Sequence, residues 1–167
     1  SVLATEANGQ DAPVAFVQAH LIPVSGPEIE RDTLVVQHGK IVAVGAQVAI
    51  PAGAEVVDAQ GKTLMPGLVD THSHIGGLAG ADGSAPIQPE IRVFDSLSPF
   101  ESGFRRALAG GITTVNVMPG SGHLLSGQTV YLKNRAKAGE ATTIDRLFQW
   151  PEGDMDHAGV PLGGIKM

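Results

Sequence analysis

The segment Met65-Pro66-Gly67-Leu68-Val69-Asp70-Thr71-His72-Ser73-His74 decides the fold class of this chain. It is an apolar run that ends in two histidines, and residues two apart on a β-strand place their side chains on the same face. A neutral imidazole is the commonest protein ligand for a catalytic divalent metal. The spacing of His72 and His74 therefore predicts a strand that ends at a metal site.

Short runs rich in β-branched residues precede this segment. They cover residues 14–24, the two halves of residues 32–45, and residues 55–58, and turns containing glycine or proline separate them. No helical period occurs before residue 99. The pattern predicts a small antiparallel β-sandwich over residues 13–64, preceded by a polar leader over residues 1–12.

The sequence pattern changes after the histidine pair. Residues 75–98 form a predicted loop, and loops of this length within compact domains are usually functional. A helix is predicted over residues 99–110, with Phe100, Phe104 and Leu108 on its buried face. We expect this helix to connect two parallel strands.

A nearly continuous apolar strand is predicted over residues 112–118, directly after the helix. Strand, loop, helix and strand in this order are typical of the βαβ unit of a parallel sheet. A second glycine-rich loop, a third strand over residues 128–133 and a short helix over residues 142–150 follow.

Composition and charge exclude several classes of partner. The 167 residues carry a formal net charge of −6 and no run of Lys or Arg, so we expect neither nucleic acid nor an anionic membrane as a partner. No cysteine is present, which leaves histidine, carboxylate or a modified side chain as metal ligands. We expect a soluble protein, but the sequence leaves its compartment open between the cytoplasm and export after signal removal.

Five segments resemble the metal-dependent amidohydrolases, and within them the branch related to imidazolonepropionase and prolidase. One such segment alone is weak evidence, but the five occur here in the order that the family has. They are residues 39–45, 51–58, 66–74, 111–115 and 119–128.

The resemblance implies an α/β fold with an all-β part. Residues 13–64 form one segment of a small β-sandwich that further chain completes, and residues 65–167 form the first strands of a TIM-like (β/α)₈ barrel. A barrel of this kind takes about 250 residues, so this chain does not complete it. We therefore expect the remainder of the barrel to come from a further segment or chain.

The implied activity is hydrolysis of a C–N bond in a small amide, cyclic amide or dipeptide-like substrate by metal-activated water. His72 and His74 carry over as ligands of one or two divalent ions, with zinc expected. Lys166 corresponds to a lysine that some members carboxylate to bridge two metals. Asp70 either orients a ligand histidine or satisfies backbone donors at the end of its strand.

Other polar residues have weaker assignments. His123 and Gln128 lie in and after the second glycine-rich loop, and each is a candidate substrate contact, against a solvated loop residue and the start of a strand respectively. His157 stands among acidic residues and glycines, which indicates a polar loop more than a metal cluster.

Two alternative functions stay open at this point. The chain can be a truncated, non-catalytic relative that acts as an assembly module, or part of a deaminase of heterocycles from the same superfamily. We expect a small-molecule substrate and a homo-oligomer.

Overall fold

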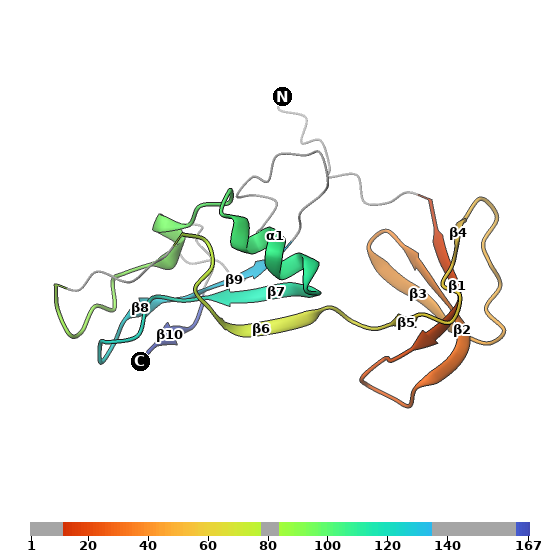
Figure 1. Ribbon diagram of the computed structural model, residues 1–167, viewed down its shortest axis with the longest axis horizontal. Coiled ribbons are helices and arrows are strands. Elements are labelled where there is room, and N and C mark those ends of the chain that lie inside the picture. The colour runs from red at the N-terminus through yellow and green to blue at the C-terminus, as the bar shows by residue number, and fades with distance from the viewer. Residues whose placement is uncertain (1–11, 78–83, 135–162) are drawn as a thin grey trace, which may run out of the picture. The chain divides into compact units, whose positions relative to one another are not determined.

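The computed structural model describes residues 12–77, 84–134 and 163–167, in two compact units that divide between Pro66 and Gly67 (Figure 1). The predicted leader, the predicted helix over residues 142–150, and His157 lie outside the described residues. None of the helices in the described ranges has the length and hydropathy needed to cross a membrane.

The first unit contains one mixed β-sheet. Its strand order is β3-β2-β1-β4, with β5 also paired to β1. The described residues thus supply one layer of the predicted sandwich. The strands are β1 (Val14–Leu21), β2 (Ile29–Gln37), β3 (Lys40–Gly45), β4 (Glu55–Asp58) and β5 (Thr63–Leu64).

The prediction that this unit is purely antiparallel is wrong. β1 pairs antiparallel with β2, but β4 and β5 both run parallel to β1. Parallel neighbours need a crossover connection, and the β2–β3 hairpin lies between β1 and β4 in the chain and provides it. The sequence pattern identifies the strands of this sheet, but it contains no signal for which neighbour β4 and β5 pair with or in which direction they run.

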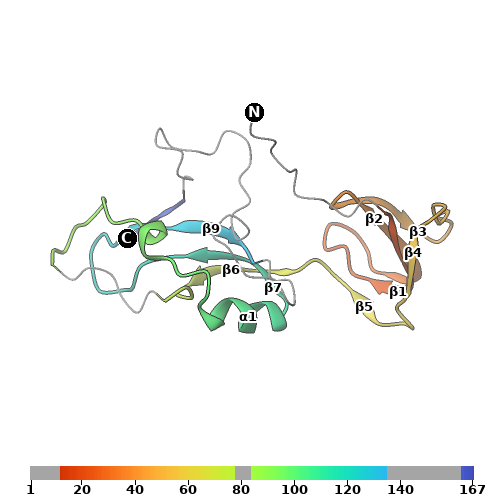
Figure 2. The same ribbon diagram turned by 90° about the horizontal axis from the view of Figure 1, so that it is seen from above.

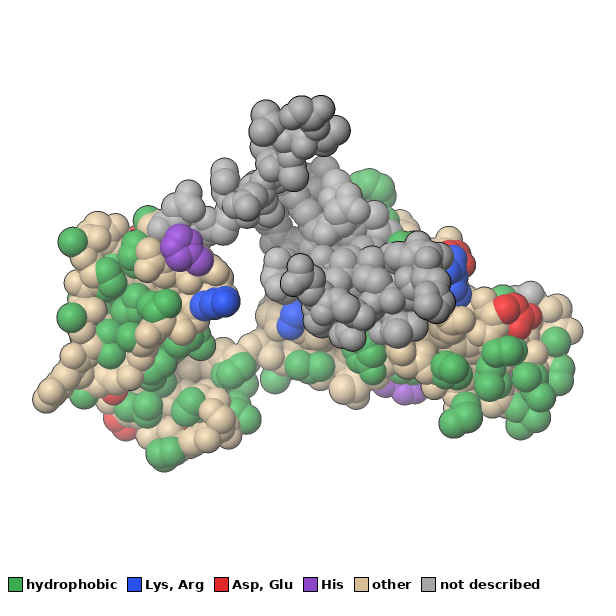
Figure 3. Space-filling model, turned by 180° about the vertical axis from the view of Figure 1, so that it is seen from behind, with side chains coloured by type: hydrophobic (Ala, Val, Ile, Leu, Met, Phe, Trp, Pro, Cys, Tyr) green, Lys and Arg blue, Asp and Glu red, His purple; other side chains and the backbone are tan. Residues whose placement is uncertain are grey.

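One side of this sheet carries an apolar groove. Its volume is about 470 Å³, and its lining includes Phe16, Leu34, Val36, Ile41 and Val44. Figure 3 shows apolar side chains, in green, gathered on the surface of this unit in the left part of the view. The sheet therefore leaves apolar surface that the described residues of the unit do not cover.

The second unit is built on a three-stranded sheet in the order β6-β7-β9. β6 (Leu68–Ser73) and β7 (Ile112–Val117) are parallel, and α1 (Ser102–Ala109) connects them and covers one face of the sheet (Figure 2). This confirms the predicted βαβ unit. The core between helix and sheet consists of Val93, Leu97, Phe104, Val115, Val117, Val130 and Leu132.

The third predicted strand divides into two and does not continue the parallel repeat. β8 (Gly127–Gln128) pairs with β10 (Ile165–Lys166), whereas β9 (Val130–Lys133) pairs antiparallel with β7. No helix lies between β7 and β9 in the chain. Without a crossover helix, the chain returns along β7 in the opposite direction.

The predicted helix begins later than expected. Residues 99–101 lie outside α1, because Glu101 is the N-cap and its side chain accepts a hydrogen bond from the backbone N–H of Gly103 at 2.8 Å. Phe104 is 2% exposed and belongs to the core, but Phe100 is 73% exposed. The prediction that Phe100 is buried is therefore wrong, because the residue precedes the cap and does not follow the helical period. A 3₁₀ turn, η1 (Val93–Ser96), precedes this region.

We expect Phe104→Ala to lower the free energy of unfolding by about 3–5 kcal/mol, because it removes a large buried side chain and leaves a cavity. Phe100→Ala is the matched control and should change stability by less than about 0.5 kcal/mol. Urea denaturation of both variants measures the difference. Equal losses in the two variants would contradict the assignment of Phe104 to the core.

Candidate metal centre

The histidine pair lies where β6 ends, beside the end of β7. Asp70 pairs with Val115 and Ser73 pairs with Val117, so three steps along β6 match two along β7. Such a bulge changes the direction of the side chains near it. Simple alternation along a strand therefore does not by itself describe this segment, since His72 lies within the irregular part and His74 follows the last strand residue.

The two imidazoles nevertheless converge. Nε2 of His72 lies 3.3 Å from Nε2 of His74, and the rings meet nearly perpendicular, at 81°. Two nitrogens that each lie about 2.0–2.1 Å from a tetrahedral zinc ion are separated by about 3.3 Å. Both side chains are exposed. The spacing therefore fits two ligands of one metal ion that is reached from solvent.

A backbone carbonyl determines which nitrogen of His74 carries the proton. Nδ1 of His74 lies 2.9 Å from the carbonyl oxygen of Met118. A carbonyl only accepts hydrogen bonds, so Nδ1 donates and the neutral ring has its lone pair on Nε2. The lone pair of His74 thus faces the nitrogen of His72, which is the arrangement that metal binding requires.

The backbone of the same segment is held at two further points. Asp70 Oδ1 accepts a hydrogen bond from the backbone N–H of His72 at 3.0 Å, which corresponds to the second of the two roles considered for Asp70. The backbone N–H of Met118 donates to the carbonyl of Ser73 at 2.9 Å. These contacts tie the turn that carries His72 and His74 to its own strand and to β7.

Lys166 reaches the same end of β7 from β10. Its Nζ donates to the carbonyl of Pro119 at 2.9 Å and to Oγ of Ser121 at 2.9 Å. Pro119 directly follows Met118, whose carbonyl holds His74. A metal-bridging role for a carboxylated Lys166 stays a prediction.

The two candidate substrate contacts have different surroundings. Gln128 donates from Nε2 to the carbonyl of Pro89 at 3.2 Å and from its backbone N–H to Ile91 at 2.7 Å, so it joins two loops. Nδ1 of His123 is buried and has no hydrogen-bond partner within the described residues. A substrate role for either residue stays a prediction.

The described side chains provide only part of a ligand set. Within residues 12–77, 84–134 and 163–167, no three His, Asp or Glu side chains group closely enough to hold a metal. Catalytic zinc has three protein ligands. His72 and His74 would therefore need at least one further ligand.

Sequence reasoning missed the carbonyl of Met118 and the carboxylate of Glu101. The first is a backbone atom, which no residue type signals. The second had no clear signal, since the residues that indicate an N-cap are Ser, Thr, Asp and Asn rather than Glu.

No protein-family model matches the chain. Curated relatives include a dihydroorotase of Trichlorobacter lovleyi, 33% identical over 117 residues, and an enamidase of Eubacterium barkeri, 35% identical over 102 residues. These alignments cover 68% and 60% of this chain, but 24% and 22% of the relatives. A solved amidohydrolase from Thermotoga maritima superposes with a TM-score of 0.71 and 32% identity, covering 81% of this chain and 36% of that one.

This chain belongs to the amidohydrolase superfamily. The family and the fold class predicted from the sequence are confirmed: a small β-rich unit is followed by the first strands of the superfamily's α/β part. The chain spans about a quarter of the length of the curated relatives that it matches. The similarity to the superfamily therefore concerns only the matched quarter of those relatives.

We expect Asp70→Ala to lower the free energy of unfolding by about 1 kcal/mol, because it leaves the backbone N–H of His72 without its acceptor. Asp70→Asn keeps a side-chain oxygen in that place and should cost less. Chemical denaturation of the two variants tests this. A larger loss in Asp70→Asn would contradict the assigned contact.

Proposed function

We propose that this chain supplies the first metal ligands of an enzyme that hydrolyses a C–N bond in a small amide. The observation that carries the proposal is the 3.3 Å separation of the two Nε2 atoms, with the lone pair of His74 directed between the rings by the Met118 carbonyl. Superfamily membership supports it, since its relatives include named amidohydrolases.

The metal is a divalent cation, with zinc expected as one or two ions, and His72 and His74 would hold it through Nε2. When bound, such an ion polarises a carbonyl group and lowers the pKa of bound water. The residues of this chain would orient the ligands: Met118 fixes the tautomer of His74, and Asp70 fixes the backbone at His72. The remaining ligands would come from further residues of the complete barrel.

The names of two relatives support a cyclic amide as the substrate class. Dihydroorotase and L-hydantoinase, which hydrolyse cyclic amides, match this chain at 33% and 29% identity. We therefore favour a cyclic amide over a dipeptide-like substrate. The assignment to the branch of imidazolonepropionase and prolidase, and the expected homo-oligomer, stay predictions.

The apolar groove of the first unit supports a composite sandwich. A groove lined by Phe16, Leu34, Val36 and Ile41 exposes apolar surface that a second layer would remove from water. We propose that a further segment of the same polypeptide supplies this layer.

We expect the double variant His72→Ala/His74→Ala of the full-length protein to lose bound zinc, measured by elemental analysis, together with hydrolysis of cyclic amides. The control is His20→Ala/His38→Ala, which removes two histidines of the first unit. His20 contacts Glu28 at 3.0 Å within that unit, whereas the histidine pair belongs to the second unit. Stoichiometric zinc in the first double variant would refute the proposal.

A further inference from the structure

We propose that Glu101 is a positioning residue for the histidine pair, because its carboxylate holds the backbone two residues beyond His74. This inference rests on the proposed metal centre. Glu101 itself touches neither imidazole, and it would act through Gly76.

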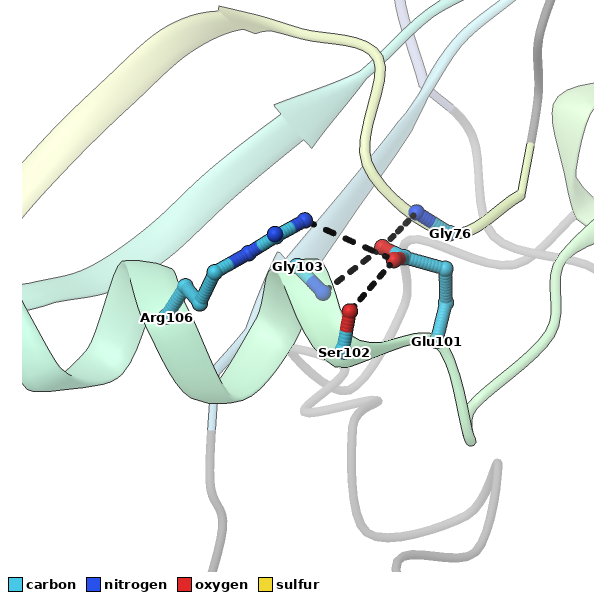
Figure 4. Close-up of polar contacts among 5 residues, drawn as sticks. All are labelled: Gly76, Glu101, Ser102, Gly103 and Arg106. Carbon is cyan, nitrogen blue, oxygen red and sulfur yellow. Dashed lines mark hydrogen bonds and ion pairs between the residues drawn. The ribbon is translucent and has the colours of Figure 1, made fainter.

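The carboxylate of Glu101 joins the helix to the segment that leaves β6 (Figure 4). Its Oε2 accepts hydrogen bonds from the backbone N–H of Gly103 at 2.8 Å and from that of Gly76 at 3.2 Å. Its Oε1 accepts from the hydroxyl of Ser102 at 3.2 Å and lies 3.9 Å from Arg106. One oxygen thus serves both the first turn of α1 and the chain beyond the histidines.

The backbone carbonyl of Gly76 also makes a hydrogen bond, in addition to its N–H. Its carbonyl accepts a hydrogen bond from the backbone N–H of Ser98 at 2.9 Å. Its φ of +102° favours glycine, and a Cβ at this position would lie 2.5 Å from Cδ1 of Leu97. Residue 76 is therefore buried between the side chain of Leu97 and the carboxylate of Glu101, with little room to shift.

The contacts of Gly76 affect His74 because only a few residues separate Gly76 from the residues that Met118 contacts. On one side, Met118 contacts both Ser73 and the ring of His74. On the other side, only Ile75 separates His74 from Gly76, and Ile75 packs against the core of the second unit. The backbone at His74 is thus fixed from both directions, and the direction of its Nε2 depends on both anchors.

The charge of Glu101 suits this role. Hydrogen bonds from the backbone of Gly103 and then of Gly76 lower the pKa of Glu101, with smaller contributions from Ser102 and Arg106, against an opposing effect of burial. The group is therefore a carboxylate at neutral pH, with acceptor sites for all of these donors. An acceptor at the N-terminus of a helix also satisfies an otherwise unpaired N–H.

Two substitutions separate positioning from helix capping. Asp is as good an N-cap residue as any, so Glu101→Asp can still cap α1, but its side chain is one methylene too short to keep the contact with Gly76. Glu101→Gln keeps the length and one acceptor oxygen. If Glu101 only caps the helix, Asp should replace it; if it positions His74, Gln should replace it better.

The experiment measures zinc affinity of the full-length protein by competition with a chromophoric chelator. We expect Glu101→Asp to weaken zinc binding roughly tenfold, as expected when an outer partner of a ligand is lost, and Glu101→Gln to weaken it less. Asn134→Ala is the control for stability. It removes hydrogen bonds to Phe104 at 2.8 Å and Ile112 at 3.1 Å, near the start of β7, and should leave zinc affinity unchanged.

A second measurement does not depend on metal. In the zinc-free protein, ¹⁵N NMR of the imidazoles should show His74 with its proton on Nδ1, protected from exchange by Met118. Glu101→Asp should lose this protection, and Asn134→Ala should keep it. Absence of zinc binding in the unaltered protein would refute the proposed function, while NMR still decides the role of Glu101. Wild-type zinc affinity or a protected His74 ring in Glu101→Asp would overturn the inference.

Discussion

The parallel pairing of β6 with β7 is the constraint on which the second unit depends. It brings the end of β7 beside the end of β6, so that the backbone of Met118 reaches both Ser73 and His74. Val115 and Val117 of β7 stabilise the pairing, because they are fully buried in the core that includes Phe104 of α1. Burial of these apolar side chains thus determines where β7 ends relative to β6, and so where the Met118 carbonyl can meet His74.

The same end of the sheet gathers contacts from three distant parts of the chain. Met118 follows β7, Lys166 arrives with β10, and Glu101 stands at the start of α1. The carboxyl ends of parallel strands are where connecting loops begin, and barrel enzymes build their sites from such loops. Among the described residues, His72 and His74 would bind the metal, and one backbone carbonyl, of Met118, and two carboxylates, of Asp70 and Glu101, hold the segment that carries them.

Much of the fold could be predicted from the sequence, because the spacing of apolar residues and the positions of turn residues are local properties. The longer strands, the helix and the βαβ order were predicted in this way, whereas the two-residue strands β5 and β10 were not. The direction of β4 and β9 was not, since it depends on how the chain returns across a sheet. Phe100 was misassigned because the capping contact of Glu101, rather than apolar spacing, determines where the helix begins.

The sequence by itself determined the chemistry that the end of β6 offers: two imidazoles, two residues apart, at the end of an apolar strand. Only the tertiary structure decided that their Nε2 atoms lie 3.3 Å apart and that the lone pair of His74 faces His72. The physical reason is that the decisive partners are a carbonyl 44 residues away and a carboxylate that binds Gly76 from 25 residues away. Contacts at such separations arise from packing, and a backbone carbonyl is the same at every residue.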